Sequence, residues 1–197
     1  FLDSLLSKDD YISRKEYRSE STKCNETLAK LILMDQENVL AAWCKQNKVD
    51  FKKLKFLMDK FSKTESLVKK HNDEYVLNHL KTDKEYLDSV LEKDDPNIKL
   101  DEEQRRVVLS DEDYTLVIAG AGAGKTTTIE AKVKYLVDKK NINPDRVLIV
   151  SFTRKATEEL KERFARLQIP VNIATFHSIG NTIIKENLSY LLTSEHK

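Results

Sequence analysis

The chain has 197 residues, of which 34% are charged and 40% are apolar, and its formal net charge is +1. This length allows one large or two small domains, and the composition is that of a soluble protein with a heavily charged surface. Basic and acidic residues nearly balance on both sides of residue 95, so charge alone does not indicate a nucleic-acid partner. A long apolar run and a signal-peptide pattern are both absent, which argues against membrane insertion and secretion.

Residues 1–95 contain neither glycine nor proline, and their apolar residues recur at helical spacing. The pattern predicts three or four amphipathic helices, some of them paired as an antiparallel hairpin. The positions that carry this pattern are Leu28, Leu31, Ile32, Val39, Leu40, Trp43, Phe51, Leu54, Met58, Phe61, Val68 and Tyr75. The capping-box spacing of Thr82 and Glu85 predicts one more helix from about residue 83.

Nine lysines stand against three acidic residues between positions 45 and 70. A lysine-rich helix face turned to solvent is the commoner explanation of such a run. The alternative is a surface for DNA or for a protein partner within residues 1–95. Cys24 and Cys44 have no CxxC pattern and the four histidines lie far apart, so we expect free thiols in a reducing cytoplasm and no structural zinc.

A polar break at residues 92–99 carries the first proline of the chain. We place a domain boundary there, between a helical N-terminal domain of residues 1–95 and a second domain of residues 96–197. Asp101 is expected to cap a short helix directly after the break. Gln104 then stands at the third helical position, where helix capping alone would account for a glutamine.

The second domain is organised around residues 115–128. A run of β-formers, Thr115 to Ile118, leads into a glycine-rich turn and then into a helix, and this order is typical of a phosphate-binding loop. Glycines let the backbone N–H groups approach a polyphosphate, and the helix directs its positive end to the same place. The predicted nucleotide-binding residues are Gly120, Ala121, Gly122, Ala123, Gly124, Lys125, Thr126 and Thr127. Lys125 would reach the β- and γ-phosphates of ATP, and the Thr126 hydroxyl would bind Mg²⁺.

After the loop, helical and strand patterns alternate to the end of the chain. An apolar stripe of Ile129, Val133, Leu136 and Val137 predicts a helix, and residues 147–150 form an apolar run expected of a buried parallel strand. Thr153 is expected to cap the next helix, whose inward positions are Ala156, Leu160, Phe164 and Leu167. Residues 171–174 are expected to form a third strand, and residues 178–192 a last helix. The fold class is therefore α/β: a truncated P-loop, RecA-like parallel-sheet domain, preceded by an all-α helical region.

Four short motifs follow one another in this part of the chain. They are L-D-E-E-Q at 100–104, A-G-A-G-A-G-K-T at 119–126, S-F-T-R-K-A at 151–156 and A-T-F-H-S at 174–178. In this order they resemble the Q motif and motifs I, Ia and Ib of superfamily 1 DNA helicases of the UvrD/Rep type. A loop that begins with alanine, here Ala119, is usual in that family. Arg154, where the family usually has asparagine, and a charged helical region before the Q motif resemble its helicase IV branch.

The resemblance covers roughly residues 86–192 and implies roles for individual side chains. It implies ATP and Mg²⁺ as cofactors, with Gln104 at the adenine edge, and single-stranded DNA or a duplex/single-strand junction as the partner in repair or recombination. Phe152 would stack on a base, and a core position is its alternative. A structural histidine is the alternative for His177. The DNA contacts implied by the resemblance are Phe152, Thr153, Arg154, Lys155, Thr175, Phe176 and His177.

A complete helicase also needs an apolar strand ending in Asp-Glu and arginines from a second motor domain. No such acidic pair follows Lys125, and Asp94-Asp95 precedes the loop without a strand before it. The chain also begins with Phe1 rather than methionine. We therefore expect it to be a fragment of a larger cytoplasmic motor and to be inactive in ATP hydrolysis by itself.

Two other functions fit parts of the sequence. HelD-like ATPases, which act on RNA polymerase, also place a long helical segment before a UvrD-like motor, although A-T-F-H-S at 174–178 favours the DNA helicase. The second alternative is a helical interaction module joined to a degenerate nucleotide-binding domain. The intact pair Lys125-Thr126 argues against that module.

Overall fold

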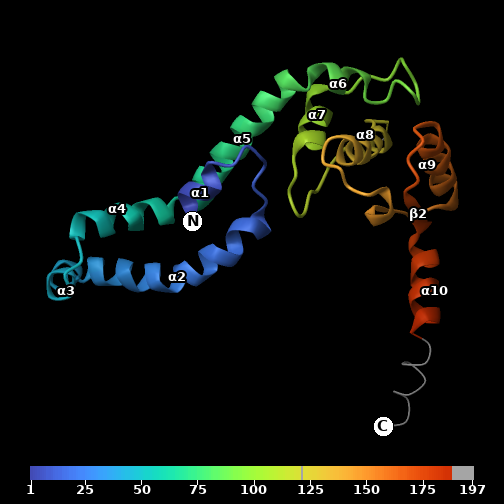
Figure 1. Cartoon of the computed structure of the whole chain (residues 1–197). Coiled ribbons are helices and arrows are strands. Elements are labelled where there is room, and N and C mark those ends of the chain that lie inside the picture. The colour runs from blue at the N-terminus through green and yellow to red at the C-terminus, as the bar shows by residue number, and fades with distance from the viewer. Residues whose placement is uncertain (121, 188–197) are drawn as a thin grey trace, which may run out of the picture. The chain divides into compact units, whose positions relative to one another are not determined.

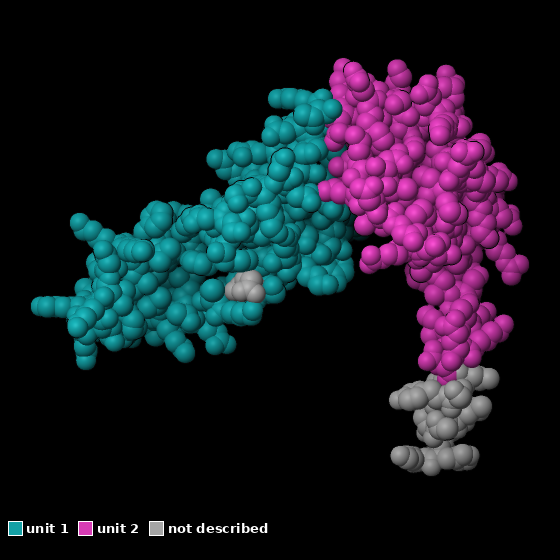
Figure 2. Space-filling view, viewed as in Figure 1, with its two compact units in different colours: residues 1–82, 109–117 teal, residues 83–108, 118–197 magenta. Residues whose placement is uncertain are grey.

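The chain folds as two compact units in the computed structural model, which describes residues 1–120 and 122–187. Unit 1 consists of residues 1–82 and 109–117, and unit 2 consists of residues 83–108 together with the chain from residue 118 onward (Figure 2). The segment 109–117 therefore leaves unit 2, packs with the N-terminal helices, and returns just before the phosphate loop. Each unit is described by itself below.

Unit 1 is built from helices alone: α1 (Leu2–Leu6), α2 (Arg14–Gln36), α3 (Leu40–Gln46), α4 (Phe51–Ser62) and α5 (Thr64–Thr82) (Figure 1). Without glycine or proline, α2 continues for 23 residues before it ends. α2 and α4 run antiparallel beside each other, with the short α3 between them in the chain, which confirms the predicted hairpin. In the described part of the chain, none of the helices has both the length and the apolar character required to cross a membrane.

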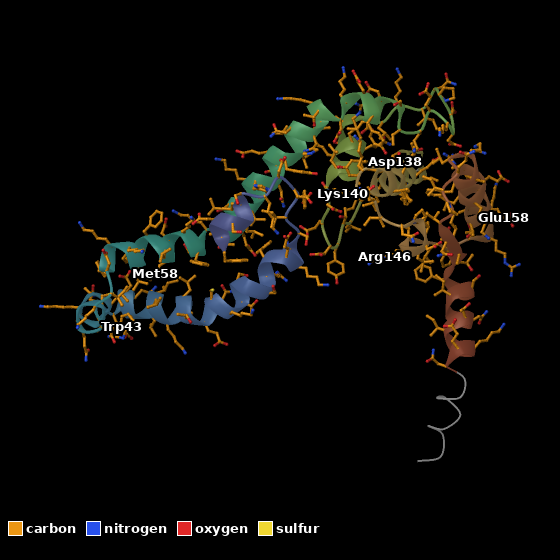
Figure 3. All side chains as sticks on the ribbon, viewed as in Figure 1. Trp43, Met58, Asp138, Lys140, Arg146 and Glu158 are labelled. Atoms are coloured by element: carbon orange, nitrogen blue, oxygen red, sulfur yellow. The ribbon has the colours of Figure 1, made fainter. Side chains whose placement is uncertain are left out.

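Small apolar clusters hold unit 1 together, and two of them lie among the residues that the structure describes. One contains Leu5, Ile12, Tyr17 and Val68. The other joins three helices through Leu40, Cys44 and Met58, with Leu28, Leu31, Met34 and Leu54 packed around them. Figure 3 labels Met58 on α4 and Trp43 on α3. Several residues of the predicted apolar pattern remain more than one third exposed, namely Ile32, Val39, Trp43 and Phe51.

Hydrogen bonds from side chains hold the backbone at Ile12 and at the start of α2. The buried Asn72 side chain accepts a hydrogen bond from the Ile12 N–H and donates one to the Ile12 carbonyl, both at 2.9 Å. The first N–H groups of α2 are bound from a distant segment: Glu112 accepts from Arg14 N at 2.7 Å, and Asp113 accepts from Lys15 N. Acidic groups at a helix start satisfy free donors and complement the helix dipole, so segment 109–117 caps α2.

Unit 2 begins with α6 (Lys84–Ser89) and α7 (Glu102–Leu109), whose last residue falls in segment 109–117. After the phosphate loop come α8 (Lys125–Asp138), the 3-10 turn η1 (Pro144–Arg146), β1 (Leu148–Ser151), α9 (Arg154–Arg166), β2 (Asn172–Thr175) and α10 (Phe176–Glu186) (Figure 1). In the described residues, α1 to α6 make six helices before residue 95, where three or four and one more from about residue 83 were predicted.

The two strands pair in parallel, with Leu148 opposite Asn172 and Ser151 opposite Thr175. α9 connects them and contacts both strands, burying Leu160, Phe164 and Leu167 at its predicted inward positions. The Thr153 hydroxyl accepts from Ala156 N at 3.2 Å, which confirms the predicted cap. A largely helical chain with a small parallel sheet confirms the α/β class.

Several sequence-based predictions about single elements are wrong. Residues 115–118 form no strand, and Ile118 is 89% exposed. A buried parallel strand needs a neighbouring strand to satisfy its backbone, and among the described residues the sheet consists of β1 and β2 alone. Ile129 is exposed instead of lying in an apolar stripe, and Thr82 ends α5 instead of capping α6. Of the predicted last helix, residues 188–192 lie outside the described residues.

Candidate functional site

The phosphate loop has the left-handed backbone that its glycines allow. Gly122 and Gly124 have φ angles of +77° and +72°, a region that a residue with a Cβ occupies only at a cost. Gly124 is the N-cap of α8, so the helix starts directly at Lys125. The turn and helix start predicted from the sequence are therefore present, whereas the strand before them is not. Gly120 and Ala123 are described as loop, and Ala121 lies outside the described residues.

The Lys125 side chain folds back over its own loop. Its Nζ donates to the carbonyl of Ala119 at 3.1 Å and to that of Gly120 at 2.5 Å. Thr126 and Thr127 follow in the first turn of α8, where backbone N–H groups have no partner inside the helix. An ammonium group and free helical N–H donors converge at one place, which is the donor set that binds an anion.

Gln104 touches this loop from α7. Its Oε1 accepts from Asp101 N at 2.9 Å while Asp101 Oδ1 accepts from Gln104 N at 2.8 Å, which is a reciprocal capping box. Its Nε2 lies 3.5 Å from the carbonyl of Ala123. A Cβ added to Gly124 would lie 2.4 Å from that same Nε2. Helix capping by Gln104 is therefore observed, and its contact with adenine stays a prediction.

Two cationic side chains hold α7 next to the loop. Arg105 donates to the Leu100 carbonyl at 2.9 Å and to Asp88 at 2.6 Å, which ties the start of α7 to α6. Lys132 of α8 donates to the Val108 carbonyl at 3.0 Å. Because both ends of α7 are anchored, Gln104 keeps a defined position against the loop.

A second group of predicted residues lies where the two strands end. Ser151 and Thr175 are opposite each other in the parallel register, so Phe152 and Phe176 each follow directly at the same edge of the sheet. Phe152 is 80% exposed and Phe176 is 65% exposed. Phe152 is therefore not packed in a core among the described residues, and its contact with a base stays a prediction. Two aromatic side chains are thus presented to solvent from adjacent strand ends.

Each aromatic residue stands beside a capped helix start. Thr153 caps α9, and Thr175 caps α10 by accepting from Ser178 N at 3.2 Å. Arg154, Lys155 and His177 are exposed in the first turns of these helices. The Thr175 side chain is buried and bonded to the Ser178 hydroxyl at 2.8 Å, so it positions the turn. Exposed aromatic and basic groups at helix N-termini form a surface suited to a phosphate backbone and its bases.

A buried charged cluster joins α8, α9 and the segment before α7, and sequence reasoning missed it. Glu130 of α8 has no exposed side-chain surface, and the side chain of Asp94 is 2% exposed. Arg163 of α9 lies 3.3 Å from Glu130 and 3.6 Å from Asp94, while Arg166 also pairs with Asp94. One Glu130 oxygen, Oε1, is buried without a hydrogen-bond partner among the described residues.

Burial raises the pKa of Glu130 to about 7, and the charge of Asp94 acts in the same direction, against the attraction of Arg163. The signal available in the sequence is a glutamate, Glu130, among the apolar positions of the helix after the loop. Asp94, the other acidic residue of the cluster, lies 36 residues away in the chain, so a local pattern does not connect the two. The cluster is therefore a tertiary contact that links the phosphate-loop helix to the helix after β1.

The comparisons with known proteins first show which family part of the chain is similar to. Residues 100–195 match the family model described as "UvrD/REP helicase N-terminal domain". That segment contains Gln104, the phosphate loop and both strand-to-helix turns. The match does not extend over residues 1–99.

Individual relatives agree with this class. A probable DNA helicase II homolog of Mycoplasma capricolum is 44% identical over 92 residues, which are 44% of this chain and 12% of that protein. The ATP-dependent DNA helicase PcrA of Staphylococcus aureus is 39% identical over 89 residues, 43% of this chain and 12% of the helicase. A probable DNA helicase of Mycoplasma pneumoniae is 38% identical over 94 residues, 45% of this chain and 18% of that protein. The chain thus spans less than a fifth of the length of these relatives.

Proposed function

We propose that the chain is the first part of a motor domain of an ATP-dependent DNA helicase or translocase that acts on single-stranded DNA. In this proposal residues 96–197 carry the motor elements, residues 1–95 form a separate helical region, and the protein belongs to the helicase IV branch. The observation that carries the proposal is the pairing of two sites in one domain: an anion-binding loop and a pair of exposed aromatic residues at parallel strand ends.

The residues of the loop fit a nucleotide with its magnesium ion. The loop offers the N–H groups at the start of α8, the ammonium group of Lys125 and the hydroxyl of Thr126. Between Gly120 and Gly124 the sequence has no side chain larger than a methyl group. Bound ATP would supply the phosphoryl group whose transfer to water drives movement. Lys125 would exchange the carbonyls of Ala119 and Gly120 for phosphate oxygens, and Thr126 would hold the metal.

The strand-end surface supports binding of single-stranded nucleic acid without sequence preference. Phe152 and Phe176 would stack on bases, each such contact contributing roughly 1–3 kcal/mol. Arg154, Lys155 and the free N–H groups of α9 would bind phosphates, which position the strand. Arg154 also distinguishes this chain from the usual motif and supports the helicase IV branch.

The remaining catalytic parts would come from outside these 197 residues. Hydrolysis needs an acidic magnesium ligand and arginines of a second motor domain, and one such arginine is worth about 10³–10⁵ in rate. We therefore expect residues 1–197 to bind ATP or ADP weakly and to show no measurable hydrolysis.

The test is binding of a fluorescent ATP analogue and of labelled oligodeoxythymidine to residues 1–197. Lys125→Ala should abolish nucleotide binding and leave DNA binding largely intact, whereas Phe152→Ala should leave nucleotide binding intact and weaken DNA binding only in part, because the phosphate contacts remain. About three neutralised phosphates predict a slope of log affinity against log salt near −2. The proposal would be contradicted if Lys125→Ala bound the nucleotide as tightly as the unchanged protein. It would also be contradicted if the affinity for DNA changed neither in Phe152→Ala nor with salt concentration.

A further inference from the structure

An apolar groove of about 260 Å³ runs between α2 and α4 of unit 1. The side chains that line it recur every three or four residues on both helices, chiefly Leu28, Leu31, Leu54, Leu57, Met58 and Phe61. α3 packs against this helix pair through Leu40 and Cys44, which contact Met58. The groove itself is open to solvent, and Leu57 in its lining is 38% exposed.

Lysines border the open side of the groove. Lys23 and Lys30 on α2 are seven residues apart, as are Lys53 and Lys60 on α4, and seven residues are two helical turns. Each of the four directly precedes a residue that lines the groove: Cys24, Leu31, Leu54 and Phe61. Because α2 and α4 are antiparallel, the same one-residue offset turns both pairs toward the same open side.

These lysines are not neutralised equally by their surroundings. Lys60 pairs with Asp3 of α1. Lys30 and Lys53 are exposed and make no ion pair with any residue that the structure describes. Asp50 caps α4 and Asp35 pairs with Lys55, while Glu26, one helical turn before Lys30, makes no ion pair with it among the described residues. The groove therefore has an apolar floor and a positive rim.

We propose that this groove is a docking site for an amphipathic helix of an acidic partner protein. Apolar residues of that helix at positions i, i+3, i+4 and i+7 would fill the space above Leu28, Leu31 and Leu57. Its glutamates and aspartates would face the lysine rim, which steers association and sets the orientation of the helix. This role is separate from nucleotide and DNA binding, because every residue involved belongs to unit 1.

The chemistry of the floor favours a protein over a nucleic acid. Leucine and methionine side chains gain from burial against other apolar groups, whereas a phosphate backbone would leave them exposed to water. The one aromatic residue lining the groove, Phe61, is half-buried among these aliphatic side chains. A stacking platform for bases instead presents its rings to solvent, as Phe152 does in unit 2.

The experiment measures fluorescence anisotropy of a labelled model peptide with residues 1–197. The acidic probe carries leucines at helical spacing with glutamates between them, and the basic probe replaces every glutamate with lysine. The acidic peptide should bind saturably and the basic peptide should not. Leu57→Glu should weaken binding of the acidic peptide more than about tenfold, since it places a charge in the apolar floor.

Charge reversal tests the rim separately. Lys30→Glu combined with Lys53→Glu should weaken the acidic peptide about tenfold at low salt, and the difference should shrink as salt screens it. The matched control is Lys52→Glu, which changes an exposed residue on another face of α4 and should alter affinity less than about twofold. Circular dichroism of each variant verifies that the helices are retained.

Three results would overturn the proposal. The first is equal binding of acidic and basic peptides, or no saturable binding of the acidic one. The second is competition between the acidic peptide and oligodeoxythymidine that Lys30→Glu with Lys53→Glu removes, which would make the groove rim a DNA surface. The third is a dimer of the chain that Leu57→Glu dissociates, which would make a second copy the occupant. All three leave the tests of Lys125 and Phe152 unaffected.

Discussion

The phosphate loop and the two strand-end turns follow the same order in sequence, a β-forming run, a turn and a helix, but they are held in different ways. β1 and β2 pair along four residues each, and threonines cap the helices that follow. Residues 115–118 have no such ladder, and the loop relies on Gln104, on two left-handed glycines and on the charged cluster behind α8.

This difference shows which contacts a β-forming run needs before it becomes a strand. Backbone donors and acceptors of an isolated run are satisfied by water, and pairing becomes favourable only where a second strand lies alongside. Variants in the phosphate loop therefore test how far its side chains and glycines determine its conformation. Variants in the strand-end turns test a surface whose position is already set by backbone pairing.

The largest expected effect falls on the loop. In the longer protein that we propose, Lys125→Ala should abolish ATP turnover, because the charge on the β- and γ-phosphates loses its cation. Single-stranded DNA binding should largely survive, since the strand-end surface does not depend on the loop. Phosphate release with and without DNA is the measurement. Lys134→Ala on the same helix is the matched control, and near-normal turnover by Lys125→Ala would remove the loop assignment.

Phe152→Ala should affect the strand-end surface and leave the phosphate loop unchanged. Loss of a stacking contact of roughly 1–3 kcal/mol should uncouple ATP hydrolysis from unwinding more than it weakens DNA binding, because phosphate contacts remain. The ratio of base pairs opened to ATP hydrolysed is the readout. Phe56→Ala removes an aromatic residue of unit 1 that is 64% exposed, compared with 80% for Phe152, and should have no effect. Unwinding at the normal rate by Phe152→Ala would make that surface idle.

Gly124→Ala should show how strongly the loop depends on its backbone. The left-handed φ of +72° and the approach of the new Cβ to Gln104 Nε2 should lower the free energy of unfolding by about 1–2 kcal/mol and weaken nucleotide binding. Gly180→Ala in α10 meets no atom within 4 Å and should stabilise by about 0.5–1 kcal/mol. Chemical denaturation of residues 1–197 compares the two, and equal effects would refute this account.

A further expected effect, a dependence of stability on pH, concerns the charged cluster. Glu130 has a pKa raised from its ordinary value of 4.5 to about 7, so the folded state retains a proton that the unfolded chain has lost. Stability should therefore fall as pH rises from about 4.5 to 7, by at most about 1.4 kcal/mol per pH unit. Glu130→Gln should flatten this dependence and stabilise the protein above pH 7.

Denaturation at a series of pH values measures this slope. Glu158→Gln changes an exposed glutamate of α9, labelled in Figure 3, and should leave the slope as it is. An unchanged slope in Glu130→Gln would mean that the buried carboxyl does not titrate in this range.

Much of the candidate site could be predicted from local sequence. Glycines alternating with alanines before Lys125 require a tight turn wherever they stand, and Thr153 and Asp101 cap their helices through neighbours three residues away. The apolar run at 147–150 and the inward positions of α9 were also predicted, because helix and strand periodicities are local properties. The roles of Gln104, Thr126 and the DNA-contact residues stay predictions.

Tertiary structure decided what depends on partners far away in the chain. By itself the sequence determined the α/β class and the glycine turn before Lys125, since each rests on residues a few positions apart. Only the folded chain decided that residues 115–118 remain unpaired, that segment 109–117 caps α2, and that Asp94, Glu130 and Arg163 meet in a buried cluster. A strand needs a second strand beside it and a buried charge needs a partner of opposite charge. Both partners lie far away in the chain, so a local sequence pattern does not identify them.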